Sequence, residues 1–315
     1  MRTLVTGGAG FIGSTLVDRL LAEGHTVDAI DDLSTGSLGN LADARAQSQR
    51  RFTFHRFDIR GPDVVDLIAH RRPEVIFHLA AQADVRLSVA RPTFDAEVNV
   101  LGSLHVLEGA RAAGTAKVVF ASSGGTIYGE PEHLPIRESH PQRPLSPYGV
   151  AKKAVGDYLV AYRELHQLEF TSLALANVYG PRQDPNGEAG VVAIFAARLL
   201  AGLSCTVFGD GRQTRDFVYV DDVADAFARA ATRGGGLLLN IGTGVETSVN
   251  ELYRVMASSA GVSDPPVRAP ARAGELLRSV LDPGRAGIHL GWKPWTAVEE
   301  GTAQVLRWFA SQKTR

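Results

Sequence analysis

The chain has 315 residues, which suits one large domain or two domains that share a core. Its formal net charge is −1 and 21% of its residues are charged, so no basic excess points to nucleic acid or to an anionic membrane. No apolar run is long enough to cross a bilayer, and the N-terminus enters a strand pattern without the features of a signal peptide. Cys205 is the only cysteine, so no intrachain disulfide can form, and we expect a cytoplasmic protein.

The first part of the chain alternates short apolar runs with amphipathic segments. Apolar runs predict strands at residues 2–6, 26–32, 52–59, 74–81 and 117–123. Helical periodicity predicts helices between them, at residues 14–25, 62–71 and 99–114. Strands that alternate with helices form parallel βαβ units, and right-handed crossovers assemble these units into an open sheet. The predicted fold is therefore α/β, with a Rossmann-type doubly wound parallel sheet.

The pattern changes after residue 177. A polar loop rich in glycine and proline covers residues 179–190, and a helix is predicted at 190–202. Residues 206–231 predict a strand, a turn, a short strand and a helix, and 236–244 predict a further strand. We expect a dinucleotide-binding domain over residues 1–177, to which some later strands return. A smaller, interwoven α/β substrate domain is expected over residues 178–315.

A glycine-spaced turn follows the first predicted strand. Gly7 permits the tight turn, Gly10 lets backbone amides approach a pyrophosphate, and Gly13 lets the next helix pack closely on the strand. The N-terminus of that helix would present free N–H groups to phosphate. Asp31 ends the second strand, eighteen residues after Gly13, where a carboxylate accepts hydrogen bonds from the adenosine ribose and repels a 2′-phosphate. The cofactor predicted is NAD.

A second candidate site combines "FASSGGTIYG", residues 120–129, with "SPYGVAKK", residues 146–153. Tyr148 and Lys152 are one helical turn apart, so both side chains lie on one helix face. We expect the lysine ammonium to favour the phenolate and to lower the pKa of Tyr148, which then acts as a general base.

Taken together, "TGGAGFIG", "YGVAK" and the "SS…YG" strand end resemble the extended short-chain dehydrogenase/reductases. More narrowly, "NVYGPRQDPNG" and "GDGRQTRDFVYVDDV" resemble nucleotide-sugar 4-epimerases of the UDP-galactose 4-epimerase type. The resemblance extends from residue 1 to about residue 308. It implies an isomerase that holds NAD tightly, oxidises the sugar at C4 to a transient ketone and returns the hydride to the opposite face.

The resemblance also implies the site residues. Tyr148 carries the proton, and Lys152 tunes it and holds the nicotinamide ribose. Besides these two and the three glycines, the residues implied to line NAD are Phe11, Ile12, Asp31, Asp32, Asp58, Ile59, Leu79, Ala80, Ala81, Gln82, Asn99 and Ser122. On the substrate side, the resemblance places Asn177 near the sugar, Thr206 and Phe208 along the uracil, Arg215 and Arg272 on the diphosphate, and Glu275 on the uridine ribose.

The stretch from residue 120 to 129 departs from the family pattern. A hydroxyl usually precedes the threonine by two residues, and this chain has Gly124 there. The hydrogen bond to the sugar 4-OH is therefore expected from Ser123 or Thr126, with the choice left open. Related 4,6-dehydratases carry an Asp-Glu pair where this chain has Gly125 and Thr126, which argues against dehydration.

The identity of the sugar stays open among three classes. Ser279 is small at a position where a bulky tyrosine closes the family's pocket, so UDP-GlcNAc and UDP-GalNAc are candidates beside UDP-glucose and UDP-galactose. Asn177 and the "GPRQDP" segment argue against a uronate such as UDP-glucuronic acid, although Arg182 could reach a carboxylate. UDP-glucose and UDP-galactose are the preferred pair.

Other function classes are less well supported. A net NAD-dependent oxidoreductase would exchange its cofactor with solution, and a dinucleotide-sensing protein could lose the Tyr/Lys pair that this chain keeps. No histidine has metal-ligand spacing, so no metal is expected, and His78 is predicted to lie in the core. No nucleic-acid or membrane partner is expected. Relatives pair two helices per subunit, here around residues 93–113 and 148–167, which implies a homodimer.

Overall fold

The computed structural model describes residues 1–48, 50–186, 190–271 and 276–313. Seven parallel strands form one sheet in the order β11-β6-β5-β4-β1-β2-β3. Their bounds are β1 Arg2–Thr6, β2 Thr26–Asp31, β3 Phe52–Arg56, β4 Val75–His78, β5 Lys117–Ser123, β6 Glu169–Leu175 and β11 Leu237–Ile241. The prediction of a doubly wound Rossmann-type sheet is confirmed. The central strands are buried along almost their whole length because helices cover both faces.

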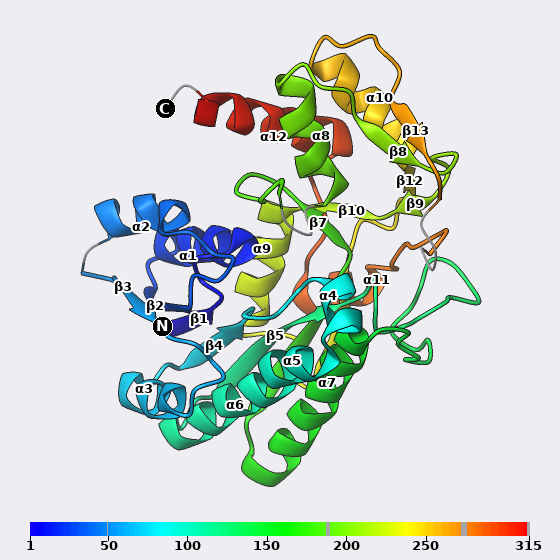
Figure 1. The fold of residues 1–315 in the computed structure, drawn as a ribbon. Helices are drawn as coiled ribbons and strands as arrows, with labels where there is room; N and C mark the ends of the chain where they lie inside the picture. Colours follow the sequence, from blue (N-terminus) through cyan, green and yellow to red (C-terminus); the bar gives the residue numbers. More distant parts are fainter. Residues whose placement is uncertain (49, 187–189, 272–275, 314–315) are drawn as a thin grey trace.

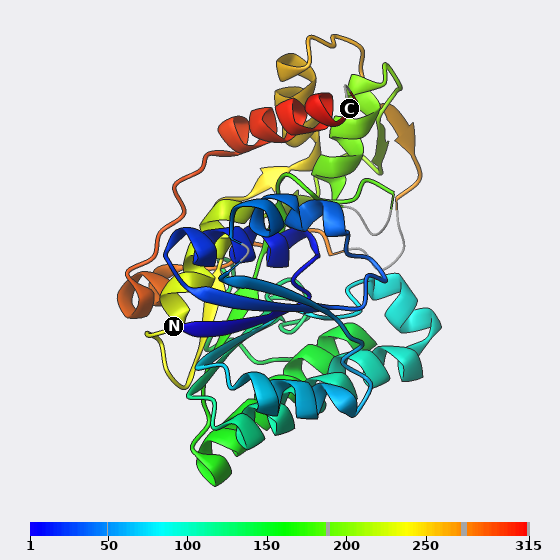
Figure 2. The same cartoon turned by 90° about the vertical axis from the view of Figure 1, so that its left-hand side faces the viewer.

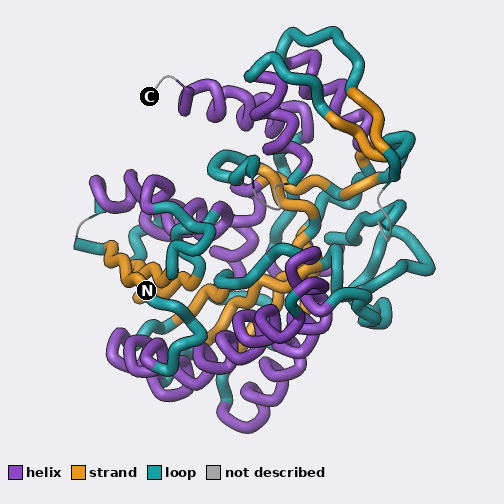
Figure 3. Tube along the Cα trace, in the orientation of Figure 1, coloured by secondary structure: helices purple, strands orange, loops and turns teal. Residues whose placement is uncertain are grey.

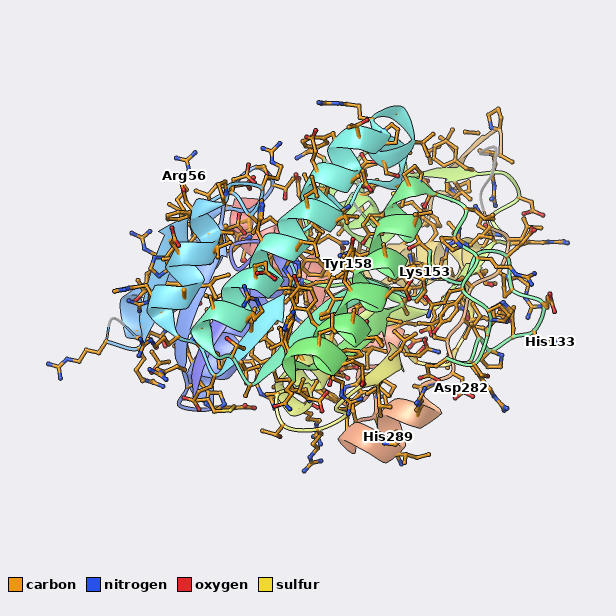
Figure 4. All side chains as sticks on the ribbon, turned by 90° about the horizontal axis from the view of Figure 1, so that it is seen from below. Arg56, His133, Lys153, Tyr158, Asp282 and His289 are labelled. Carbon is orange, nitrogen blue, oxygen red and sulfur yellow. The ribbon has the colours of Figure 1, made fainter. Side chains whose placement is uncertain are left out.

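Each face of the sheet carries its own layer of helices (Figures 1 and 2). One face packs against α1 (Phe11–Ala22), α9 (Val220–Ala230) and α11 (Gly284–Leu290), which share one apolar cluster with the strands. The other face packs against α3 (Asp63–Arg71), α6 (Gly102–Ala113) and α7 (Pro147–His166). Viewed from that side, α6 and α7 run next to each other across the sheet (Figure 4). Three short helical segments complete the sheet region: η1 (Leu38–Leu41), α2 (Ala42–Gln47) and α4 (Val85–Ala90).

The chain direction across the sheet reverses between β3 and β4. Strand β1 pairs with β2 on one side and with β4 on the other, both in parallel. The segments that follow β1 and β4 therefore diverge to opposite faces and leave a crevice at the carboxyl edge of the sheet. This is the place where an open parallel sheet binds ligands.

A smaller group of elements lies beyond that carboxyl edge (Figures 1 and 3). Helices α8 (Val191–Leu200), α10 (Val249–Ser259) and α12 (Val298–Lys313) pack around a separate apolar cluster. Three two-stranded sheets belong to this region: β7 (Asn177–Tyr179) with β10 (Phe217–Tyr219), β8 (Thr206–Phe208) with β13 (Val267–Ala269), and β9 (Thr214–Arg215) with β12 (Thr247–Ser248). None of the described helices combines the length and the apolar composition that a bilayer crossing requires. The division after residue 177 stays a prediction.

A buried carboxylate joins the two regions. The side chain of Asp216, which is 1% exposed, accepts hydrogen bonds from the backbone N–H groups of Thr243, Gly244 and Leu281 and from the Thr243 hydroxyl. Its own carbonyl accepts from the N–H of Asn177. The side chain of Asp216 thus holds the segment after β11 and the segment around residue 281, and its backbone carbonyl holds the start of β7.

Replacing Asp216 by alanine leaves three backbone N–H groups without their acceptor, so we expect the variant to lose about 3 kcal/mol of unfolding free energy. Urea denaturation measures this loss. Asp210→Ala is the matched control, because the Asp210 side chain is exposed and its carboxylate accepts a local hydrogen bond from the Arg212 N–H. Equal losses in the two variants would contradict the role assigned to Asp216.

Candidate active site

The turn between β1 and α1 has no room for side chains. Gly7 has a φ of +69°, and a Cβ on it would lie 2.8 Å from the backbone nitrogen of Ala80. A Cβ on Gly13 would lie 2.0 Å from the carbonyl oxygen of Gly7. The first glycine is therefore required by backbone conformation and the third by the contact between helix and turn. Both reasons agree with the roles predicted from the spacing.

Helix α1 begins at Phe11, directly after this turn, and not at residue 14 as the periodicity predicts. Within the described part of the chain, no side chain caps its N-terminus, where Gly10 is the N-cap. The first backbone N–H groups of a helix have no intrahelical acceptor, and the helix dipole makes this end positive. An uncapped helix end after a glycine turn fits the pyrophosphate of a dinucleotide. Phe11 and Ile12, both predicted to line the cofactor, form this first turn.

Asp31 is fixed beside the glycine turn. Its two carboxylate oxygens accept hydrogen bonds from the N–H of Ala9 (2.9 Å) and the N–H of Leu33 (2.8 Å). Burial raises its pKa, and these backbone donors act in the opposite direction. The neighbouring Asp32 accepts from the N–H and hydroxyl of Ser34. A carboxylate held at the end of β2 fits the hydroxyls of an adenosine ribose.

Two further residues that the family resemblance places along NAD, Asp58 and Ile59, follow β3. Asp58 is partly exposed and pairs with Arg60, whose hydrogen bonds lower the pKa of the Asp58 carboxyl. Ile59 is buried against Gly102 on α6, where a Cβ would lie 2.8 Å from its side chain. The carbonyl of Ile59 contacts the His105 ring nitrogen Nδ1 at 2.9 Å.

The segment after β4, residues 79–82, is tied down at both ends. The N–H groups of Leu79 and Ala80 both lie 3.2 Å from the Thr6 hydroxyl. At the other end, the Asn99 side chain accepts from the Gln82 N–H and donates to the Gln82 carbonyl, each at 2.9 Å. The fixed segment formed by Leu79, Ala80, Ala81 and Gln82, called the strap below, lies against the glycine turn at Ala80.

The prediction that His78 belongs to the core is confirmed. It is 1% exposed, and its two ring nitrogens contact the hydroxyls of Thr6 (2.7 Å) and Ser103 (2.8 Å). Burial lowers its pKa to about 3, and the nearby Lys152 charge adds to this effect. His78 is therefore neutral at physiological pH.

Tyr148 and Lys152 lie in the first turns of α7. Ser146 caps this helix by accepting the N–H of Gly149, and Pro147 occupies its first position. The Lys152 nitrogen Nζ lies 5.6 Å from the centroid of the Tyr148 ring and 4.8 Å from that of Phe120. It donates a hydrogen bond to the carbonyl of Ala121 at 2.9 Å. The pair therefore stands at the end of β5, facing the crevice.

The prediction that the protein's own groups lower the pKa of Tyr148 is wrong. Burial raises it to about 12, the negative charge of Asp95 adds to the rise, and hydrogen bonding with Ser123 lowers it. Burial also lowers the pKa of Lys152 to about 8, while Asp95 acts in the opposite direction. The Lys152 ammonium points to the Ala121 carbonyl, so desolvation of the phenol outweighs the lysine charge.

The end of β5 supplies two hydroxyls near this pair. Ser123 is close enough to Tyr148 to lower the pKa of the phenol, whereas the Thr126 hydroxyl oxygen is buried and has no hydrogen-bond partner among the described residues. Ser122 is buried within β5. A Cβ on Gly124 would lie 2.4 Å from a methyl carbon of Leu281. The position that usually carries a hydroxyl is thus occupied by a leucine from the far end of the chain.

The predicted substrate residues lie on several elements of the smaller region. Asn177 is exposed at the start of β7, Thr206 and Phe208 are partly buried in β8, and Ser279 is buried. Arg215 is partly buried and donates to the Thr214 carbonyl.

The guanidinium of Arg182 forms an ion pair with the carboxylate of Asp18 on α1, at an N–O distance of 2.7 Å, so it already has a carboxylate partner. Arg272 and Glu275 lie outside the described residues.

Asp95 is a site residue that the sequence did not reveal. It lies on α5 (Pro92–Ala96), and its carboxylate accepts from the side-chain amides of Gln82 and Asn99. Its segment carries no recognisable motif. Only the spacing Asp-x-x-x-Asn to Asn99, one helical turn, could have drawn attention to it.

The contact between Gly124 and Leu281 predicts the effect of restoring a side chain there. Gly124→Ser should lose about 1–3 kcal/mol of unfolding free energy by overpacking. Gly125→Ser is the matched control, because a Cβ on Gly125 meets no atom within 4 Å. Combining Gly124→Ser with Leu281→Ala should destabilise by less than the sum of the two single changes, as measured by urea unfolding. Additive losses would show that the two positions are independent.

Comparison with known proteins agrees with this arrangement. Residues 3–242 match the model of the NAD dependent epimerase/dehydratase family. A UDP-glucose 4-epimerase from Mycolicibacterium smegmatis is 53% identical over 313 residues, which cover 99% of both chains.

Two solved structures are also similar over almost the whole chain. The UDP-glucose 4-epimerase from Thermotoga maritima, solved with UDP-glucose, has a TM-score of 0.95 and 43% identity, covering 99% of this chain and 100% of that one. The UDP-glucose 4-epimerase from Thermus thermophilus, solved in complex with NAD, has a TM-score of 0.91 and 44% identity, covering 98% of this chain and 99% of that one. The family match and these similarities show that the chain belongs to the NAD dependent epimerase/dehydratase family.

Proposed function

We propose that this protein is an NAD-dependent 4-epimerase of UDP-hexoses, with UDP-glucose and UDP-galactose as its preferred pair. The observation that carries the proposal is the position of Tyr148 and Lys152 beside the carboxyl ends of β1, β4 and β5, in front of an uncapped helix end. The 53% identity to a UDP-glucose 4-epimerase along the full chain supports the choice of substrate.

The residues around the crevice have separate tasks in this proposal. The uncapped start of α1 binds the pyrophosphate, Asp31 binds the adenosine ribose, and the strap of residues 79–82 lies against the rest of the cofactor. When bound, NAD accepts a hydride from C4 of the sugar and later returns it, and its positive ring favours the phenolate of Tyr148.

Tyr148 takes the proton of the sugar 4-OH and gives it back after the ketone has turned its other face. Its pKa of about 12 keeps the phenol protonated until that cationic ring is close. Ser123, whose hydroxyl lies close enough to Tyr148 to lower its pKa, is the better placed hydroxyl for the 4-OH. The unpartnered Thr126 hydroxyl is the alternative donor to the sugar. Lys152 holds the nicotinamide ribose and keeps a positive charge beside the phenol.

The smaller region is proposed to hold the UDP moiety. Thr206 and Phe208 would lie along the uracil, Asn177 near the sugar, Arg215 and Arg272 on the diphosphate, and Glu275 on the uridine ribose. Guanidinium groups suit a diphosphate because they donate paired hydrogen bonds to its oxygens. For Arg182, its ion pair with Asp18 argues against a role as carboxylate ligand, and thus against UDP-glucuronic acid as substrate.

Assembly and location complete the proposal. Helix α7 exposes large apolar side chains on its outer face, among them Tyr158, which projects from the face seen in Figure 4. Val150, Val160 and Leu165 are exposed on the same helix. These side chains support a homodimer formed through α6 and α7, in which they would be shielded from water.

We place the enzyme in the cytoplasm, where its lone buried Cys205 stays reduced.

The activity is tested by an NMR time course of the purified protein, without added NAD, on an equal mixture of UDP-glucose, UDP-GlcNAc and UDP-glucuronic acid. We expect the C4 epimer of UDP-glucose to appear first, because the cofactor is regenerated in every turnover and stays bound. Tyr148→Phe should lower the rate about 10²–10⁴-fold while the fold and the bound NAD are kept.

If no sugar changes until NAD is added and NADH then accumulates, the protein is a net oxidoreductase and the epimerase proposal fails. A Tyr148→Phe variant with undiminished rate would exclude Tyr148 as the proton carrier.

Ser279 offers a test of substrate choice, because its small side chain is buried on the substrate side. Ser279→Tyr should lower the rate on UDP-GlcNAc about tenfold or more relative to that on UDP-glucose, since the larger side chain fills the space of the N-acetyl group. Initial rates on both sugars measure the ratio. An unchanged ratio of the two rates would show that Ser279 does not line the sugar pocket.

A further inference from the structure

A buried carboxylate lies directly behind the Tyr148–Lys152 pair. Asp95 is 1% exposed on the short helix α5, which packs against α7. One of its oxygens accepts hydrogen bonds from Gln82 Nε2 and Asn99 Nδ2, each at 2.9 Å. A buried charge needs such donors because water is no longer available to solvate it.

Of the two amide side chains that bind Asp95, that of Gln82 belongs to the strap and that of Asn99 holds the strap. The Asn99 side-chain amide accepts a hydrogen bond from the backbone N–H of Gln82 and donates one to the Gln82 backbone carbonyl. The Gln82 side chain also donates to the carbonyl of Asp84. Asn99 lies in η2 (Glu97–Leu101), a single π-helical turn between α5 and α6. Such turns are frequent at functional sites because they re-aim one side chain out of the regular helix. Asp95 therefore fixes the position of the strap.

The surroundings of Asp95 contain few other charges. From α7, Tyr148 and Lys152 face it, and from η2 the carboxylate of Glu97 is exposed to solvent. The loop before α4 contributes the neutral Gln82 and the partly buried Asp84, and His78 on β4 is neutral. Asp95 is the carboxylate whose negative charge acts on the buried Lys152 ammonium. Burial disfavours that ammonium, and the carboxylate favours it.

We propose that Asp95 is a positioning residue, which holds the strap through Gln82 and Asn99 in the place where the dinucleotide binds and which faces Lys152 across the packing of α5 on α7. The part that concerns Lys152 stands on the protein alone, and the part that concerns the cofactor rests on the proposed function. Asp95 itself need not touch substrate or cofactor, since it acts through Lys152, Gln82 and Asn99.

The direct test is Asp95→Asn, which keeps the size of the side chain and removes its charge. The titration of Lys152 is followed by ¹³C NMR of its ε-methylene group between pH 6 and 10, with the signal assigned by its absence in Lys152→Arg. The wild-type midpoint is expected near pH 8, and in the variant it should move to lower pH, because an attractive charge is lost. The variant should also bind NAD about tenfold more weakly, because the strap loses charge-assisted hydrogen bonds.

Asp222→Asn is the matched control. Asp222 is equally buried, on α9, and accepts from the Thr296 N–H and hydroxyl and the Trp295 N–H. Neutralising it should lower the melting temperature but leave the Lys152 midpoint and the NAD affinity unchanged. A second variant, Gln82→Met, keeps the charge of Asp95 and removes one of its donors. It should weaken NAD binding without lowering the Lys152 midpoint.

An unchanged Lys152 midpoint in Asp95→Asn would overturn the proposal and leave Asp95 a structural residue. If that variant does not fold, the wild-type protein decides: the carboxyl ¹³C signal of Asp95 should show a second inflection at the Lys152 midpoint, and its absence would overturn the proposal. None of these titrations needs a sugar, so they distinguish a failure of this proposal from a failure of the epimerase activity.

Discussion

The close approach of two backbone segments at the carboxyl edge of the sheet is the constraint on which the site depends. The turn after β1 touches the segment after β4, so that a single added methyl group on Gly7 would meet the backbone of Ala80. Because α1 also presses on this turn through Gly13, its N-terminus is brought to the mouth of the crevice. The glycines, the uncapped helix end and the strap are consequences of one packing arrangement.

Desolvation dominates the chemistry of the residues beyond that edge. It raises the pKa of Tyr148, lowers that of Lys152 and keeps His78 neutral. In the proposed mechanism, Tyr148 therefore stays neutral until the cationic nicotinamide is bound beside it.

The sequence was sufficient where a short segment determines its own geometry. The glycine turn, the acid that ends β2, the Tyr-x-x-x-Lys pair and the core position of His78 were all predictable from local spacing and strand pattern. It failed where distant parts of the chain meet. Leu281 fills the space beside Gly124, and Asp95 reaches Gln82, only because the fold brings these segments together. The Tyr148 pKa was predicted in the wrong direction because spacing shows the neighbouring charge but not the burial.

The central claim is that one bound cofactor takes the hydrogen from C4 and returns it to the same carbon. UDP-glucose deuterated at C4 tests this most directly, with the product analysed by mass spectrometry and NMR in ordinary water. The account predicts that UDP-galactose keeps its deuterium at C4, without loss to solvent or transfer to added NAD. Loss of the label to water, or its appearance in free NADH, would contradict it.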